Sequence, residues 1–171
     1  MKKLIIALAL SVFSLMSFAQ TKYAYIDSEY ILNNIPEFIE AQKKLDNMSE
    51  TWQTEIETKR ANINKKYQQY QAEEMLLPGE MKKKKQEEIF ALEDDLAKFQ
   101  YEKFDPEKGE LFIKRKELIE PIQNKIYSAV KELASVGNYA FIFDKANQSN
   151  ILYADPKLDK SKRILKNLGY D

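Results

Sequence analysis

Hydrophobic residues recur with helical spacing along the middle of this chain. Between Pro36 and Leu76 the apolar positions advance by three, four or seven residues. They are Leu45, Met48, Trp52, Ile56, Ile63, Tyr67 and Tyr70. In a helix with about 3.6 residues per turn this spacing returns to one face. We therefore expect a long helix whose single apolar stripe packs against a partner.

Turn residues divide the rest of this helical region. The sequence Leu77-Pro78-Gly79-Glu80 predicts a reversal, because Pro and Gly favour turns. A second helix is expected from Met81 to about Phe104 and a third from Glu110 to about Val136, with Gly137-Asn138 as its stop. Together they predict an antiparallel helical arm over 36–136, with its tip near 77–81 and a break at 105–109.

The segment 81–104 carries two apolar stripes instead of one. The first contains Ile89, Leu92, Leu96 and Phe99, and the second contains Phe90, Ala97, Tyr101 and Phe104. At 100° per residue their centres lie about 130° apart, so only one stripe can face the outward helix. The second stripe is a candidate client-binding surface. It has to meet another subunit, a bound client protein or the loop near Pro106.

Short segments rich in aromatic and branched residues flank the arm and predict strands at about 22–27, 139–144 and 150–154. A final helix is expected over about 160–168, capped by Asp159. The fold class is therefore α+β and mostly α, with a long helical hairpin on a small β-sheet body. So few strands cannot form a stable sheet alone, which predicts oligomerisation. The candidate assembly residues are the aromatics Tyr23, Tyr25, Phe141, Phe143 and Tyr153.

The first 19 residues have the pattern of a secretory signal peptide. Lys2 and Lys3 precede a mainly apolar run from Leu4 to Phe18, and Ala19 is the expected cleavage position. The run is shorter than the roughly 20 apolar residues that span a bilayer. We expect export of the protein, with residues 20–171 forming a single domain.

Composition argues against catalysis. The chain has no His and no Cys, which removes the usual general base at neutral pH, the thiolate nucleophile and the commonest zinc ligands. We expect no enzyme activity, no metal and no cofactor. Asp27, Asp144 and Asp155 each follow or end a predicted strand, where a carboxylate commonly caps a turn or helix.

Charge is nearly balanced over the whole chain. Without Lys2 and Lys3 there are 25 basic and 27 acidic residues, a net charge of −2, which does not suit a nucleic-acid partner. Positive charge is concentrated in one run at the arm tip: Lys82, Lys83, Lys84 and Lys85. Apolar residues adjoin it: Met75, Leu76, Leu77 and Met81. This tip is a candidate first contact for clients or for an anionic membrane surface, and the alternative is an ordinary solvated first turn.

The end motifs resemble those of the Skp/OmpH family of periplasmic chaperones. They are Tyr25-Ile26-Asp27 before Tyr30-Ile31-Leu32, then Tyr139 to Asp144, then Ile151 to Pro156. The resemblance implies a periplasmic homotrimer whose arms surround a cavity and hold unfolded outer-membrane proteins without ATP. The best-known members are strongly basic and this chain is not. Its overall charge therefore does not favour electrostatic capture of client proteins. The alternative function is a structural coiled-coil protein that spaces or tethers envelope components.

Overall fold

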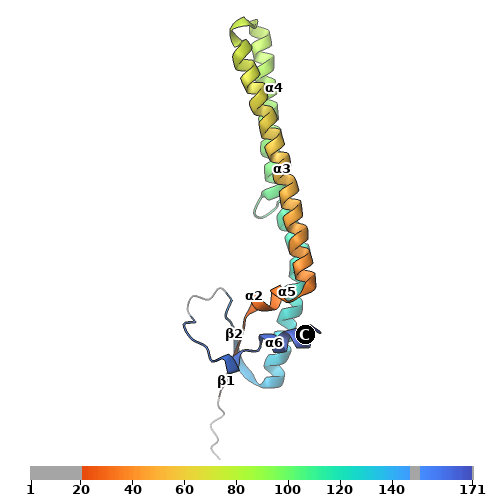
Figure 1. The fold of residues 1–171 in the computed structure, drawn as a ribbon, viewed down its shortest axis with the longest axis vertical. Helices are drawn as coiled ribbons and strands as arrows, with labels where there is room; N and C mark the ends of the chain where they lie inside the picture. The colour runs from red at the N-terminus through yellow and green to blue at the C-terminus, as the bar shows by residue number, and fades with distance from the viewer. Residues whose placement is uncertain (1–20, 147–150, 171) are drawn as a thin grey trace, which may run out of the picture.

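A long helical arm rises from a small body in the computed structural model, which describes residues 21–146 and 151–170 (Figure 1). In chain order the elements are β1 (Lys22–Ile26), α2 (Ser28–Asn33), α3 (Pro36–Glu73), η1 (Glu74–Leu76), α4 (Gly79–Phe104), α5 (Glu110–Gly137), β2 (Tyr139–Asp144), η2 (Pro156–Leu158) and α6 (Ser161–Asn167). The predicted signal peptide, residues 1–19, lies outside the described residues. None of the helices in the described ranges carries an apolar stretch long enough to cross a bilayer.

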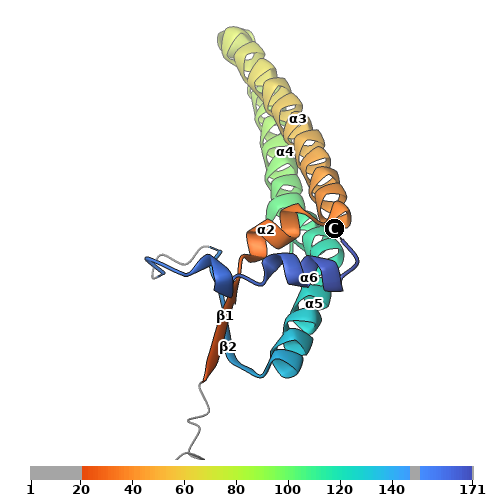
Figure 2. The same ribbon diagram turned by 60° about the horizontal axis from the view of Figure 1, so that its bottom comes forward.

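The arm is the antiparallel helical hairpin that the periodicity predicts. Helix α3 has 38 residues and is therefore about 57 Å long at 1.5 Å per residue. It begins with Pro36, whose missing N–H costs nothing in a first turn. After the reversal, α4 runs back along its outer part and α5 along its lower part, as both ribbon views show (Figures 1 and 2).

The return limb breaks at 105–109 in an ordered loop. The Asp105 carboxylate accepts hydrogen bonds from the backbone N–H groups of Glu107 and Lys108, at 3.0 and 2.7 Å. The Gly109 N–H donates to the Asp105 carbonyl at 3.0 Å. A Cβ on Gly109 would lie 2.5 Å from the backbone nitrogen of Asp105, so only glycine fits this loop.

The seam between the two limbs is narrow. Ile63 and Tyr70 pack against Ile89 near the tip, and Ala41 and Leu45 pack against Ile119 near the base. Tyr67 is 50% exposed, so its predicted place in the seam is wrong. In this half of α3 the buried positions are Ile56, Ile63 and Tyr70, spaced seven residues apart, and Tyr67 lies beside this line.

Ion pairs follow one edge of the seam at seven-residue intervals of α3. Lys59 pairs with Asp95 at 2.8 Å, and Lys66 pairs with Glu88. Glu73 pairs with Lys85 closer to the tip. Pairs seven residues apart recur on the same side of a helix, so these contacts keep the two limbs in register.

The body encloses a core between α2, α5 and α6. Ile31 of α2 and Ile164 of α6 are fully buried, and Ile122 and Ile126 of α5 complete the contact. Helix α2 was not predicted from the sequence, because its six residues are too few to reveal a periodicity. It is nevertheless central, since it places Ile31 between α5 and α6.

Strands β1 and β2 pair in parallel, with Tyr23 opposite Phe141 and Tyr25 opposite Phe143. Parallel strands need a crossover connection, and here that crossover contains the whole arm. The predicted third strand at 150–154 is wrong for its described part, since 151–154 contain no strand. The backbone of Tyr25 instead forms a bridge with Asp159, and the Tyr25 carbonyl accepts a hydrogen bond from the Lys160 N–H at 2.9 Å.

Candidate interaction surfaces

The two stripes of α4 have different environments. Ile89 is buried and Leu92, Leu96 and Phe99 are half-buried, as expected for the stripe that faces α3. In the second stripe Phe90 is 71% exposed, Tyr101 is 59% exposed and Ala97 is exposed. Large aromatic side chains at such exposure have no partner within the described chain, which makes this face a candidate interaction surface.

Phe104 does not belong to that exposed surface. It is half-buried, and its ring meets the Trp52 ring edge-on with centroids 5.9 Å apart. The same indole accepts the Lys103 ammonium over its face at 4.9 Å. The Trp52 indole thus contacts two consecutive residues of α4, and Phe104 packs inside the hairpin. The assignment of Phe104 to the client-binding stripe is therefore corrected.

Apolar side chains are exposed at the arm tip. Met75 is 91% exposed, Leu76 is 85% exposed and Met81 is 50% exposed. Leu77 differs from these three, because it packs on the cluster of Ile63, Tyr70 and Ile89 and closes the end of the seam. The exposed apolar part of the predicted tip is therefore formed by the methionines and Leu76.

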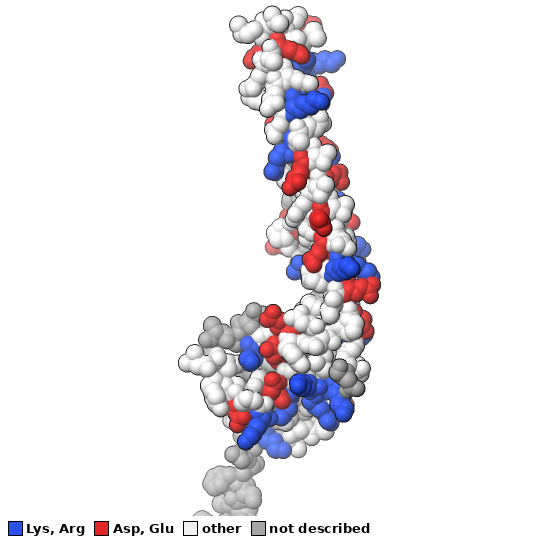
Figure 3. All heavy atoms as spheres, viewed as in Figure 1, with Lys and Arg blue, Asp and Glu red and all other residues white. Residues whose placement is uncertain are grey.

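The four tip lysines are offset by acidic neighbours. Lys85 pairs with Glu73, and Lys83 lies 3.8 Å from Glu87. Residues 73–88 hold five Glu against the four Lys, a net charge of −1. Figure 3 accordingly shows red and blue side chains mixed near the top of the arm. The folded tip presents positive charges locally without a net positive potential from this segment.

The predicted assembly aromatics lie along one face of the two-stranded sheet. Tyr23, Phe141 and Phe143 are each about half exposed, and their rings stack in a row with centroids 6.2 and 6.1 Å apart. Tyr153 is 83% exposed beside them. With Leu158, Tyr153 also lines an apolar cavity of about 450 Å³ next to this row.

Tyr25 is the exception, because it is buried within its own chain at 7% exposure. A bridge to Asp159 pairs its backbone with the segment before α6, and the Lys145 ammonium lies 5.9 Å from the centroid of the Tyr25 ring. Burial, together with the nearby Asp159 carboxylate, raises the pKa of Tyr25. Its predicted role in contacts between subunits is therefore corrected to a role inside the body.

The three aspartates act as caps, which confirms the structural interpretation made from the sequence. Asp27 Oδ1 accepts from the Tyr30 N–H at 2.9 Å, and Asp155 Oδ1 accepts from the Lys157 N–H at 3.0 Å. Asp144 Oδ1 accepts from two backbone N–H groups, those of Ser28 and Ala146. Each carboxylate therefore ends or begins a secondary-structure element.

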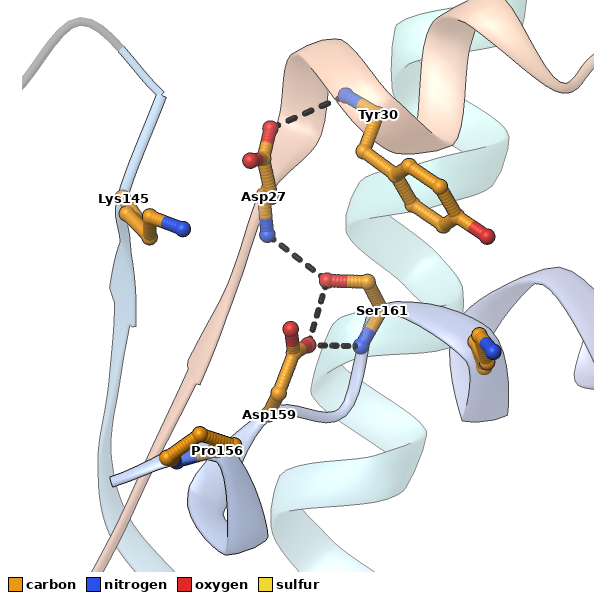
Figure 4. A pocket seen from close by; sticks show the side chains of 7 residues that line it. Asp27, Tyr30, Lys145, Pro156, Asp159 and Ser161 are labelled. Atoms are coloured by element: carbon orange, nitrogen blue, oxygen red, sulfur yellow. Dashed lines mark hydrogen bonds between the residues drawn. The ribbon is translucent and has the colours of Figure 1, made fainter. Parts of the chain in front are cut away.

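Ser161 joins these caps and was not identified from the sequence. Its Oγ accepts from the Asp27 N–H at 2.8 Å and donates to Asp159 Oδ1 at 2.6 Å, as Figure 4 shows. Ser161 is 2% exposed. It therefore ties Asp27, the residue that follows β1, to the start of α6 across 134 positions of sequence. No local sequence pattern predicts this contact.

Tyr170 fastens the end of the described chain to the base of the arm. Its hydroxyl donates to the Glu37 carboxylate at 2.9 Å. The pKa of Glu37 is lowered first by its own backbone N–H and then by this hydroxyl, and the pKa of Tyr170 is raised by the same contact. The pair links α3 to the segment after α6.

Comparisons with known proteins agree with this architecture. The model of the family described as "Outer membrane protein (OmpH-like)" matches residues 22–168. A crystal structure of a proposed outer membrane chaperone (OmpH-like) from Caulobacter crescentus CB15 superposes with a TM-score of 0.66 at 9% identity, over 88% of this chain and 85% of that one. At that identity the likeness concerns the fold. A comparison with curated proteins finds no significant match. The family match spans most of the chain, and the protein therefore belongs to the OmpH-like family.

Proposed function

We propose that this protein is a periplasmic holdase chaperone, which keeps unfolded outer-membrane proteins from aggregating without using ATP. Family membership and the shared fold with the proposed chaperone of Caulobacter support this assignment. The predicted signal peptide supports export to the periplasm. Its action would be binding and release, with no catalytic step.

The exposed stripe on α4 carries the proposal. Phe90 and Tyr101 are large, mostly exposed aromatics on a helix whose other apolar face is already occupied by α3. An aromatic side chain buries about 150–250 Å² when it is fully enclosed, and partial, shifting contact recovers only a fraction of that. Several such contacts would hold a mobile chain firmly enough to prevent aggregation and weakly enough to release it.

Assembly would turn this stripe into the wall of a cavity. A two-stranded sheet is marginal on its own, and the aromatic row of Tyr23, Phe141 and Phe143 leaves an apolar face for a second copy. We propose a homotrimer joined at this face and at Tyr153. Three arms would then rise from one base and surround the client.

The arm tips would make the first contact. Exposed Met75, Leu76 and Met81 offer flexible apolar contacts, and methionine adapts to irregular partners. Exposed lysines such as Lys83 would add attraction toward acidic segments of clients or an anionic membrane surface. Because acidic residues of the same segment offset the lysines, this attraction is expected to be short-ranged.

The decisive experiment measures holding on variants of the stripe. A urea-unfolded outer-membrane β-barrel protein is diluted into buffer without nucleotide, and light scattering follows its aggregation. The unchanged protein should suppress scattering, and the double variant Phe90→Ser with Tyr101→Ser should be several-fold weaker at equal concentration. The control is Tyr127→Ser with Val136→Ser, which removes similarly exposed side chains from α5.

The alternative is a structural protein that spaces envelope components. It predicts no suppression of scattering by any of these proteins. Equal suppression by the stripe variant and the control would place client binding elsewhere on the molecule. Helicity and oligomeric mass are measured for each variant, so that a loss of holding is not mistaken for a loss of folding.

A further inference from the structure

The arm and the segment around α6 use their positive charges differently. All nine ion pairs of the described residues lie between positions 40 and 117, in the arm. Residues 157–170 hold five Lys or Arg and one Asp. Within the described part of the chain, the α6 cations Lys162, Arg163 and Lys166 form no ion pair. Figure 3 shows blue side chains gathered on the lower body beside this helix.

A cavity of about 370 Å³ lies between α2 and α6, on one side of these charges. Its lining consists of Tyr30, Asn34, Lys162, Leu165, Lys166 and Tyr170. None of these described lining residues is acidic. The lining residue Tyr170 donates its hydroxyl to Glu37, a carboxylate that is not itself part of the lining.

The adjoining cavity of about 590 Å³ shares Tyr30 and Lys162 but has a different character. Asp27 and Asp159 both line it and offset its two lysines, Lys145 and Lys162. Figure 4 shows this cavity, with the Tyr30 ring directed from α2 toward α6. Of the two cavities, the one between α2 and α6 is therefore better suited to an anion, because its lining contains two lysines and no acidic residue.

Helix α6 presents its two lysines from a fixed base. Ile164 and Leu165 are buried in the core, and the Tyr170 N–H returns to the Leu165 carbonyl at 2.9 Å. Lys162 and Lys166 are four residues apart, so they share one face, with Cβ atoms about 5–6 Å apart. Like charges at this spacing destabilise an isolated helix, so helix stability does not explain their placement.

We propose that the α2–α6 cavity binds a phosphate group, held between the Lys162 and Lys166 ammonium groups with the Tyr30 hydroxyl as a further donor. A phosphate monoester carries up to two negative charges and three acceptor oxygens, so it can engage both lysines at once. A single carboxylate has only one negative charge and therefore balances the two lysine charges less well. The group attached to the phosphate would lie against the Tyr30 and Tyr170 rings.

The phosphate can come from a lipid headgroup or from a soluble phosphorylated molecule, and two probes separate these sources. Glycerol phosphate is titrated while NMR follows the ring protons of Tyr30 and Tyr170. Vesicles of phosphatidylcholine, with and without phosphatidic acid, are tested by cosedimentation. The variant is Lys162→Gln with Lys166→Gln. The control is Lys43→Gln with Lys65→Gln, which removes the same charge from exposed positions of the arm that form no ion pair among residues 21–146 and 151–170.

The unchanged protein should bind at least one probe. The α6 variant should bind it about tenfold more weakly or worse, because two charge-assisted hydrogen bonds are lost, and the control should stay within about twofold. Binding of both probes, or of glycerol phosphate alone, places a soluble phosphate in the cavity, and binding of phosphatidic acid vesicles alone identifies a lipid. Binding of neither probe, or equal weakening in variant and control, overturns the proposal. Client holding by the α6 variant should be unchanged, so this test is independent of the chaperone proposal.

Discussion

The arm and the body of this molecule are stabilised in different ways. In the body, Ile31 and Ile164 are completely enclosed by three helices and a sheet. In the upper arm, Ile63 and Ile89 meet across one seam, and both keep about 7% exposure. The arm adds ion pairs along its edge, whereas the body has none among its described residues. The body is therefore stabilised by an enclosed core, whereas the upper arm depends on one narrow seam and on the ion pairs along its edge.

The largest effect is expected at the apolar face of the sheet. Phe141→Asp places a charge in the proposed contact between subunits, where burying it without a partner is very costly. Phe141 is 58% exposed in the single chain, so the variant should fold and lose its assembly. Analytical ultracentrifugation should show a single-subunit mass with unchanged helicity. Tyr127→Asp, at an exposed position of α5, is the control and should keep the oligomeric mass; an unchanged mass for Phe141→Asp refutes the assembly face.

The next effect compares the two cores directly. Ile164→Ala opens a cavity in an enclosed site and should lower the free energy of unfolding by about 2–5 kcal/mol. Ile63→Ala should cost less, because the seam is open at its sides and can relax or admit water. Urea unfolding at one fixed protein concentration measures both. Equal losses would show that the upper arm is enclosed by something else, such as the arm of another subunit.

A smaller effect separates Phe104 from the exposed stripe. Phe104→Ser removes the ring contact with Trp52 and should cost about 1–3 kcal/mol of stability, while holding per folded molecule stays the same. Phe90→Ser should do the reverse and weaken holding at unchanged melting temperature. If Phe104→Ser leaves stability intact and weakens holding, the residue belongs to the client surface as the sequence pattern proposed.

The smallest effect is expected at the tip lysines. Replacing Lys82, Lys83, Lys84 and Lys85 by Gln should slow client association at low ionic strength and have little effect at high ionic strength, where charges are screened. The change should be modest because the five Glu of the tip segment already offset the lysines. Stopped-flow fluorescence at both ionic strengths measures the rates. Identical rates at low ionic strength would leave only the apolar tip residues as the first contact.

Local sequence patterns predicted the arm well because its structure depends on local interactions. Periodicity located α3, α4 and α5, and the turn residues Pro78 and Gly79 located the reversal. The return stripe of Ile89, Leu92, Leu96 and Phe99 was also assigned to the correct face. These features follow from backbone geometry and side-chain spacing, which a sequence displays directly.

The sequence by itself thus determined a mostly helical hairpin between two short strands, with an apolar stripe left uncovered on the return limb. Tertiary structure alone decided that Tyr25 is buried, that Phe104 packs on Trp52 and that α2 supplies a core residue. It also decided that two α6 lysines, which form no ion pair with any described residue, border a cavity made with Tyr30 and Tyr170. Each of these outcomes depends on contacts between positions far apart in the chain. Local propensity and periodicity carry no information about such contacts, because the partner that covers a side chain is chosen only when the helices and strands pack.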